Sequence, residues 1–593
     1  MAMIMLTRIA FAAFLLVAPS VCPCCLISAQ AGVPKGIILI SLDTLRADHL
    51  GIYGYHRNTS PYIDAFAKEN IVFENAIVQS PWTLPSHMSI MTSLYPSSHG
   101  VVARNNRLAD EHVTLAELLR EGGYKTAAFT DGAFMKGDYG FKQGFDMYDG
   151  DNCIGIARIL PKAEKWLEEN KANPFFLFIH CYDIHDPYDP PPPYDTIFHD
   201  FNYTGTFVPS TKNMQAAAWK EKEVNDDDLR HIKALYDGGI RYTDEKIGAF
   251  LSYLQEAGLK ENTLIIITSD HGEEFKEHGS FLHWKLYVRP NLHVPLIMHI
   301  PNYPKKVLRI KNLVQSIDIL PTILDSAHLP PHSKAQGSSL LSLMRRNSTF
   351  MRRFWWRLLH PFSNNEKAVF AEHQKTRGKR KQDYSMITDD YQIIYDLLAQ
   401  SVEVYHIKND PLAQKNIVKG HDETTQKLYS QLREFYNVIL KYKAETFILD
   451  EQTRGQLRAL GYMDDTDYNS VCSGDVDCDG IADDDDNCPS ISNPDQKDAY
   501  PPQGNGIGDS CDCEGDFNCD GSVDEVDRDL LRKNILQSML LAHPCTSENQ
   551  CHGDFDCDGK IDEDDKALFY DDFGRGKNSN PCPPCTVGVW CSY

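Results

Sequence analysis

The chain of 593 residues is too long for one domain, since globular domains usually contain about 100–200 residues. Its net charge of −24 is concentrated at one end: from Asp464 onward, 31 Asp and Glu stand against 8 Lys and Arg. The preceding residues are nearly neutral, which argues against nucleic acid as a partner. The acidic tail instead favours cation binding.

The first 31 residues have the pattern of a secretory signal peptide. A basic residue precedes an uncharged apolar run, and small residues end the segment at Ala29–Ala31. We expect cleavage after Ala31 and a secreted or cell-surface protein. An uncleaved membrane anchor is the alternative, because the uncharged stretch continues to Pro34. Twelve of the 17 cysteines lie between Cys472 and Cys591, which predicts disulfides in an oxidising compartment.

Apolar segments typical of buried strands alternate with helical patterns over residues 36–330. This alternation predicts an α/β fold with a largely parallel, doubly wound sheet. The expected strands cover residues 37–40, 126–130, 175–179, 263–268 and 294–299. The expected helices cover residues 88–94, 115–122, 160–170, 226–256 and 318–325. Short strands over residues 369–406, followed by a helical pattern over 423–442, predict a small antiparallel sheet with one helix packed on it.

Polar residues follow three of the expected strands. Asp43 follows the first, His185 lies beyond the third, and Asp270-His271 follow the fourth. Because the carboxyl ends of parallel strands share one sheet edge, these side chains should converge there. Thr83 stands just before an expected helix, where free backbone N–H groups bind anions. The sequence therefore predicts carboxylate and imidazole metal ligands beside a hydroxyl nucleophile.

Five segments, in this order and spacing, resemble the sulfatase family of the alkaline phosphatase superfamily; they are Ser41–Asp48, Thr83–His87, Tyr182–Pro187, Thr268–Glu273 and Gln315–Thr322. The resemblance implies an alkaline-phosphatase-like sandwich and a hydrolase of sulfuric or phosphoric esters. It also implies one divalent cation, for which Ca, Mg, Mn and Zn all remain candidates. The implied ligands are Asp43, Thr83, Asp270 and His271, with Thr44 where many members carry a second Asp.

Thr83 departs from the family pattern, which has a Cys or Ser that matures to formylglycine, and His87 stands where the pattern has Arg. A threonine cannot become an aldehyde hydrate because its β-carbon carries a methyl group. A phosphorylated threonine, however, can be resolved by in-line attack of water. The family's basic anion-binding pattern is also absent at Thr130–Ala133. These departures move the expected substrate from sulfate toward phosphate esters without excluding sulfate.

His185 is expected to contact the transferred group or the leaving oxygen. His283 is the candidate general acid, with Lys285 as the alternative. The substrate is expected to be an anionic ester, on an extracellular polymer or a lipid headgroup. A phosphoglycerol- or phosphoethanolamine-type transferase and a catalytically inactive, calcium-dependent binding protein are the competing functions. A plain helix N-cap is the simpler reading of Thr83.

Three tail segments place carboxylate or amide oxygens at loop positions 1, 3, 5, 9 and 12 with Gly at 6, the geometry of a Ca²⁺ loop. The first resembles thrombospondin type 3 repeats, and the other two resemble a dockerin or EF-hand-like domain. Several bound calcium ions are implied, with a cohesin-like or cell-surface partner or a simple spacer role as alternatives. The implied ligands are Asp475, Asp477, Asp479, Asp483, Asp486, Asp516, Asn518, Asp520, Asp524, Asp527, Asp554, Asp556, Asp558, Asp562 and Asp565.

These features divide the chain into six expected parts: a signal peptide (1–31), a catalytic domain (35–345), its C-terminal subdomain (346–463), calcium repeats (464–515), a dockerin-like domain (516–576) and a Cys-rich tail (577–593).

Overall fold

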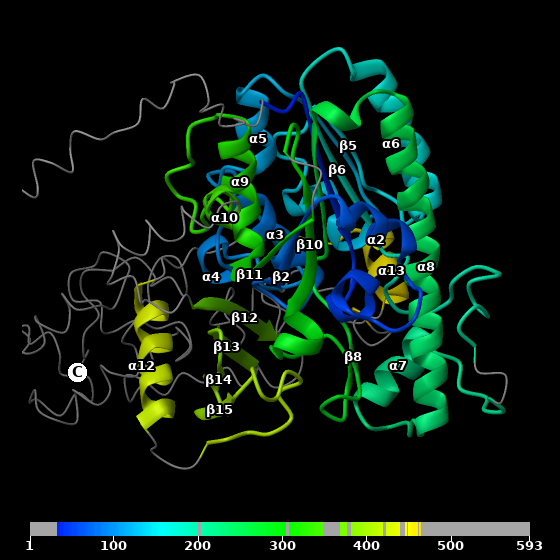
Figure 1. Ribbon diagram of the computed structural model, residues 1–593. Helices are drawn as coiled ribbons and strands as arrows, with labels where there is room; N and C mark the ends of the chain where they lie inside the picture. The colour runs from blue at the N-terminus through cyan, green and yellow to red at the C-terminus, as the bar shows by residue number, and fades with distance from the viewer. Residues whose placement is uncertain are drawn as a thin grey trace, which may run out of the picture.

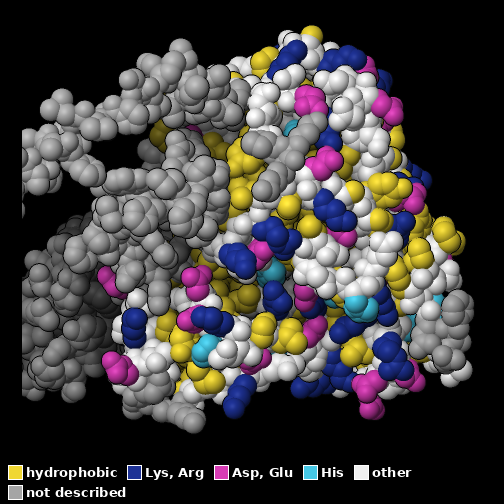
Figure 2. Space-filling model, viewed as in Figure 1, with side chains coloured by type: hydrophobic (Ala, Val, Ile, Leu, Met, Phe, Trp, Pro, Cys, Tyr) yellow, Lys and Arg dark blue, Asp and Glu magenta, His cyan; other side chains and the backbone are white. Residues whose placement is uncertain are grey.

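The computed structural model describes residues 33–199, 203–303, 307–347, 368–375, 381–418, 423–438, 445–447, 449–460 and 462–463. The expected signal peptide, calcium loops and tail disulfides therefore lie outside the described residues. Among the helices that are described, none combines the length and the apolar character needed to cross a bilayer. On the face shown in Figure 2, basic and acidic side chains are interspersed over the described surface.

An eight-stranded sheet lies at the centre of the described molecule (Figure 1). Its strands are β1 (Gly36–Leu42), β2 (Ile71–Ile77), β4 (Lys125–Phe129), β5 (Met147–Asp149), β6 (Phe175–Cys181), β7 (Thr263–Thr268), β10 (His293–His299) and β11 (Leu308–Gln315). The spatial order is β11-β2-β10-β7-β1-β6-β4-β5. The five strands from β7 to β5 run parallel, whereas β10 is antiparallel to both of its neighbours. The predicted α/β fold with a largely parallel sheet is confirmed.

Both faces of this sheet are buried, which explains why its central strands are continuous apolar runs. Along β1, Ile37 and Leu39 join the core on one face, and Ile38 and Ile40 join the core on the other. Helices cover both faces (Figure 1). The first face is covered by α3 (Thr83–Thr92), α5 (Leu115–Glu121), α9 (Ile319–Ser326) and α10 (Leu341–Asn347). The second face is covered by α2 (Pro61–Lys68), α6 (Ile156–Asn170) and α8 (Asp226–Glu256).

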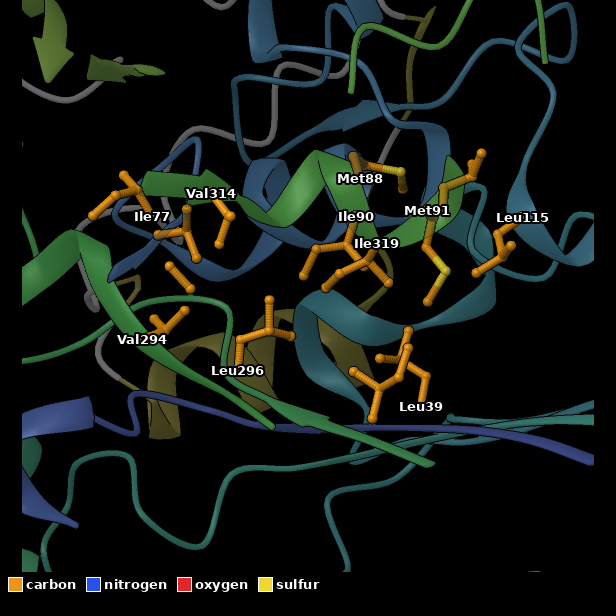
Figure 3. Packing of buried hydrophobic residues seen from close by; sticks show 14 of the residues in the cluster. Leu39, Ile77, Met88, Ile90, Met91, Leu115, Val294, Leu296, Val314 and Ile319 are labelled. Carbon is orange, nitrogen blue, oxygen red and sulfur yellow. The ribbon is translucent and has the colours of Figure 1, made fainter. Parts of the chain in front are cut away.

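The core on the first face holds α3 in place. Figure 3 shows Leu39 and Leu296 of the sheet opposite Met91 of α3 and Ile319 of α9. Each fully buried side chain of this size contributes about 1.5–3 kcal/mol. Every residue of α3 is buried. The first residue of this helix, Thr83, is therefore fixed relative to the sheet edge.

A second sheet of four antiparallel strands follows in the chain: β12 (Val369–Lys375), β13 (Lys381–Ile387), β14 (Gln392–Asp396) and β15 (Ser401–Tyr405). Helix α12 (Glu423–Val438) packs on it through Leu428 and Leu432, which meet Met386 and Ile393. The predicted antiparallel subdomain is confirmed. The chain then forms β16 (Glu445–Thr446), which pairs with β3 (Asn106–Arg107), and α13 (Glu451–Ala459), which returns to the main domain beside η4 (Ala133–Met135).

Candidate active site

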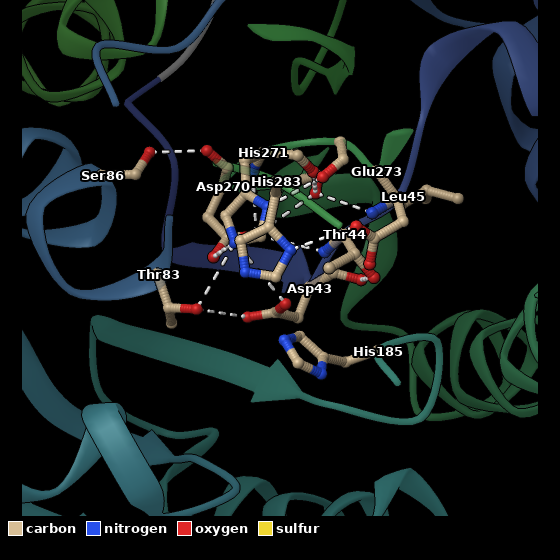
Figure 4. A network of polar contacts seen from close by, with 12 residues as sticks. Asp43, Thr44, Leu45, Thr83, Ser86, His185, Asp270, His271, Glu273 and His283 are labelled. Atoms are coloured by element: carbon tan, nitrogen blue, oxygen red, sulfur yellow. Dashed lines mark hydrogen bonds and ion pairs between the residues drawn. The ribbon is translucent and has the colours of Figure 1, made fainter. Parts of the chain in front are cut away.

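Three strands deliver the predicted residues to one edge of the central sheet. β1 lies between β6 and β7, with Leu42 paired to Cys181 and Ser41 paired to Thr268. All three strands therefore end at the same level. Asp43, His185 and the Asp270-His271 pair follow within four residues of these ends, and Figure 4 shows them gathered around one point with Thr83 and His283.

Asp43, Asp270 and His271 form a buried cluster with the composition of a metal site. One ligand atom of each lies within 4.8 Å of the others, and all three residues are 0% exposed. Asp43 Oδ1 and Asp270 Oδ2 accept no hydrogen bond from the described part of the chain. The Nδ1–H of His271 donates to the carbonyl of Gly272 at 2.9 Å. Its Nε2 lone pair is therefore left facing the carboxylates, as in a metal-binding histidine.

The electrostatics of the cluster also fit a divalent cation. Burial and the neighbouring Asp270 carboxylate raise the pKa of Asp43 well above its ordinary value. Burial lowers the pKa of His271 to about 3, so the imidazole is neutral. Two adjacent buried carboxylates without a compensating charge are costly. Oxygen ligands with one imidazole suit Ca, Mg, Mn or Zn.

Thr83 places its hydroxyl against this cluster. Its Oγ1 lies 3.3 Å from Asp43 Oδ2 and 3.4 Å from His271 Nε2, and the residue is 0% exposed. Thr83 is the first residue of α3, and the N-cap is Trp82, which makes no side-chain capping bond. The simpler reading of Thr83 as an N-cap is therefore wrong. A hydroxyl in this place lies beside the candidate cation and at the positive end of a helix.

His87 ties this hydroxyl-bearing turn to the sheet. Its Nδ1–H donates to the carbonyl of Thr83 at 3.0 Å, and its Nε2 accepts from Ser41 Oγ at 2.9 Å. Burial lowers the pKa of His87, in keeping with a neutral ring that donates once and accepts once. His87 thus positions Thr83 through neutral hydrogen bonds, where the family pattern has an arginine.

His185 and His283 close the other side of the site. The Nδ1–H of His185 donates to the carbonyl of Asp186 at 2.7 Å, and Nδ1 of His283 lies 3.2 Å from Glu273 Oε1. The two rings are 5.2 Å apart, and each directs its Nε2 into the site. Both can therefore contact a substrate oxygen. Burial lowers the pKa of His283 well below its ordinary value and raises the pKa of Glu273 to about 7, so a proton bound by this buried pair is available to a leaving oxygen.

Comparison with known proteins identifies the family. Residues 35–329 match the family model described as Sulfatase, and residues 276–438 match the model for the C-terminal region of N-sulphoglucosamine sulphohydrolase. This chain is a sulfatase-family hydrolase. It is 26% identical over 382 residues to an arylsulfatase of Clostridium perfringens, a match that covers 53% of this chain and 79% of the relative.

Solved structures show the same fold. One, with its substrate D-glucosamine-2-N,6-O-disulfate bound, matches with a TM-score of 0.57 at 21% identity, over 68% of this sulfatase-family chain and 98% of the other. A phosphonate monoester hydrolase of Agrobacterium radiobacter matches with a TM-score of 0.55 at 19% identity, over 69% and 96% of the two chains. At these identities the likeness concerns the fold alone.

Two predicted site residues of this sulfatase do not direct their side chains as expected. Thr44 Oγ1 donates to the carbonyl of Asp43 at 2.7 Å, and only its backbone N–H contacts Asp270, at 3.4 Å. Its φ of 56° is rare for a β-branched residue and turns the side chain back on its own backbone. Lys285 lies beside Tyr287, its Nζ 5.6 Å from that ring, in a cavity shared with Asp383 of the second sheet. The prediction that Lys285 is the alternative general acid is therefore wrong, because its ammonium group lies beside Tyr287 and Asp383.

Two residues at the site were not predicted. His180 Nε2 lies 3.2 Å from Asp43 Oδ2 and so supports a metal ligand. A histidine inside an otherwise apolar strand was a usable signal for it. Tyr462 places its hydroxyl 3.0 Å from Thr83 Oγ1. Nothing in the sequence around Tyr462 connects it with a residue nearly four hundred positions earlier.

The ligand loop of the sulfatase has no room for a side chain at Gly272. Its N–H donates to the carbonyl of Asn291 at 2.7 Å, and a Cβ at this position would lie 2.0 Å from the carbonyl oxygen of Pro290. We expect Gly272→Ala to lower the free energy of unfolding by about 1–3 kcal/mol through overpacking, measured by urea denaturation. Gly455→Ala is the matched control, because a Cβ there meets nothing within 4 Å. Equal stability of both variants would contradict this account of the loop.

Proposed function

We propose that this sulfatase-family chain hydrolyses sulfuric or phosphoric esters through a covalent intermediate on Thr83, and that phosphate esters are favoured. The observation that carries the proposal is the buried Thr83 hydroxyl, 3.3 Å from Asp43 Oδ2 and 3.4 Å from His271 Nε2, beside two carboxylate oxygens that accept no hydrogen bond. The arylsulfatase relative supports the ester chemistry. The covalent intermediate is proposed to be a threonine ester because the hydroxyl at this position belongs to Thr83.

Asp43, Asp270 and His271 would hold one divalent cation, with Thr83 Oγ1 completing its coordination. When bound, such an ion lowers the pKa of a neighbouring hydroxyl and stabilises negative charge on the ester oxygens.

The side chains of the site supply the remaining steps. Thr83 Oγ1 attacks sulfur or phosphorus and gives its proton to Asp43 Oδ2, while His185 Nε2 holds an equatorial oxygen. The bond to the ester oxygen breaks, and that oxygen takes a proton from His283 Nε2. Water then attacks the same central atom and returns a proton to His283, while the bond to Thr83 Oγ1 breaks and this oxygen takes back its proton from Asp43 Oδ2. Alcohol and inorganic anion leave, the anion carries the second proton of the water, and the enzyme is restored.

The threonine is the reason for favouring phosphate. A formylglycine hydrate can expel sulfate by collapsing to a carbonyl, whereas a threonine ester must be cleaved at its central atom by water. In-line attack of water at phosphorus is a well-supported route near a divalent ion. The same site geometry also accommodates sulfate esters. Turnover measurements compare sulfate esters with phosphate esters directly.

Turnover by the purified full chain tests the proposal. 4-Nitrophenyl sulfate, 4-nitrophenyl phosphate and bis(4-nitrophenyl) phosphate would each be assayed with Ca²⁺, Mg²⁺, Mn²⁺ and Zn²⁺. We expect turnover of at least one ester without an added acceptor, and a modified Thr83 peptide by accurate mass after rapid quenching. Product formation only in the presence of glycerol would instead assign a transferase. Absence of turnover under all of these conditions would instead favour a catalytically inactive binding protein.

We further propose that the tail binds calcium through its three Asp-rich loops and that the protein is exported. The proposal rests on the loop spacing around Asp479, Asp520 and Asp558. Calorimetric titration of the full chain with Ca²⁺ should therefore show several ions bound. Replacing these three residues by Asn should lower that number. An unchanged stoichiometry in the triple variant would contradict the loop assignment.

A further inference from the structure

The hydroxyl of Tyr462 occupies the centre of the candidate active site. It lies 3.0 Å from Thr83 Oγ1, 3.1 Å from His185 Nε2 and 2.9 Å from His283 Nε2. A point about 3 Å from both a nucleophile and its partner groups is where an oxygen of the reacting ester would sit. Tyr462 therefore stands in a position that a substrate needs.

The site is closed in this arrangement. Thr83 is 0% exposed, and His283, His185 and Tyr462 are 1%, 3% and 3% exposed. The Tyr462 ring packs against Phe134, with centroids 4.6 Å apart, and so covers the approach to Thr83 from that side. An ester cannot reach the nucleophile until this ring moves.

Tyr462 is carried by a surface segment that we call the strap, which consists of residues 449–460 together with Tyr462 and includes α13. Asp450 pairs with Lys136 at 2.9 Å. Gln456 accepts from the N–H of Ala133 at 2.8 Å and donates to the carbonyl of Asp151 at 2.7 Å.

These anchors are polar, and hydrogen bonds and partly exposed ion pairs each contribute little net stability. In the ion pair Lys136 is 5% exposed and Asp450 is 52% exposed. The strap adds three buried side chains to the main apolar core, those of Leu449, Leu457 and Tyr462. An element of this length with so few buried apolar side chains can open locally without global unfolding.

The hydroxyl cannot satisfy its three partners equally. A phenol has one proton, so Tyr462 can donate to only one of Thr83 Oγ1, His185 Nε2 and His283 Nε2.

We propose that the strap is an intramolecular inhibitor, in which Tyr462 occupies the place of a substrate oxygen and must withdraw before hydrolysis. This inference rests on the proposed function for the identity of Thr83 as the nucleophile. The apparent affinity for substrate is then reduced by the fraction of molecules whose strap is open.

Substitutions in the full chain test the strap. Tyr462→Ala removes the side chain that fills the site, and Gln456→Ala removes two anchors outside it. We expect kcat/KM for a 4-nitrophenyl ester to rise about tenfold in the first variant and about threefold in the second, because the open fraction increases. Gln255→Ala, at an exposed position of α8, is the matched control and should leave kcat/KM unchanged. A fall of kcat/KM in both Tyr462→Ala and Tyr462→Phe would assign the tyrosine to catalysis and overturn the proposal.

A second measurement does not depend on turnover. Amide hydrogen exchange of Thr83–Ser86 should be faster in Gln456→Ala than in the unsubstituted chain, and inorganic phosphate should bind the Tyr462→Ala variant more tightly. Unchanged amide exchange and unchanged phosphate binding would overturn the proposal that the strap inhibits the site. Faster amide exchange in Gln456→Ala without turnover of any ester would support the proposed opening of the strap and would refute the proposed hydrolase activity.

Discussion

Replacing Thr83 by Val should abolish ester turnover while leaving the fold intact. Valine has nearly the same shape as threonine and substitutes a methyl group for the hydroxyl, so the packing of the buried α3 is kept. Loss of a covalent nucleophile should lower kcat by about 10³-fold or more. The rate would be measured at saturating metal, and the melting temperature would show that the variant is folded.

Two further variants sharpen this result. Thr83→Ser keeps the oxygen and should retain turnover within about tenfold, with the same modified peptide. Thr92→Val is the matched control, because Thr92 lies at the other end of the same helix and its hydroxyl donates to Met88 at 2.7 Å. It should reduce stability without changing kcat. Turnover by Thr83→Val within tenfold of the unsubstituted enzyme would remove Thr83 from the nucleophile position.

The strongly patterned elements of the fold could be predicted because local pattern and tertiary burial agree there. The expected strand 263–268 and helix 226–256 coincide with β7 and α8. β2 and β11 were not predicted. β2 carries half-buried Glu74 and Asn75 in its middle, and the pairing of β11 with it is interrupted by a register shift, so neither strand shows a clean period.

The metal ligands could be predicted because each follows its strand directly, and strand ends in a parallel sheet share one edge. The direction of side chains beyond the strand ends could not be predicted. Lys285 is two residues from His283, a spacing that keeps two side chains on one face only within a strand. β9 (Phe281–Leu282) ends before His283, and Leu282 has a φ of 68°, so the alternation is broken there. The contact between Tyr462 and Thr83 depends on tertiary packing of a distant segment, which no local pattern encodes.

Removing the divalent cation should abolish turnover and lower the melting temperature, and the ligand carboxylates provide the decisive comparison. A cation that binds only the folded state adds about 2.7 kcal/mol to the free energy of unfolding at one hundred times its dissociation constant. Asp43→Asn should lose this cation-dependent stabilisation. In the presence of chelator, however, it should be at least as stable as the unsubstituted chain. The reason is that burial, and after it the neighbouring Asp270 carboxylate, disfavours the charge of Asp43.

A partly buried carboxylate away from the cluster is the matched control. Asp64 accepts the backbone N–H of Ile52 at 2.7 Å and lies outside the site, and burial raises its pKa as it raises that of Asp43. Asp64→Asn should keep the full cation-dependent rise in melting temperature, measured by calorimetry with Mn²⁺. The tail is the same in all three proteins, so any contribution from it cancels in the comparison. If Asp43→Asn retained the same rise as Asp64→Asn, the cation would bind elsewhere. Asp43 would then be only a neighbour of Thr83, and the account of its nucleophilicity would fail with it.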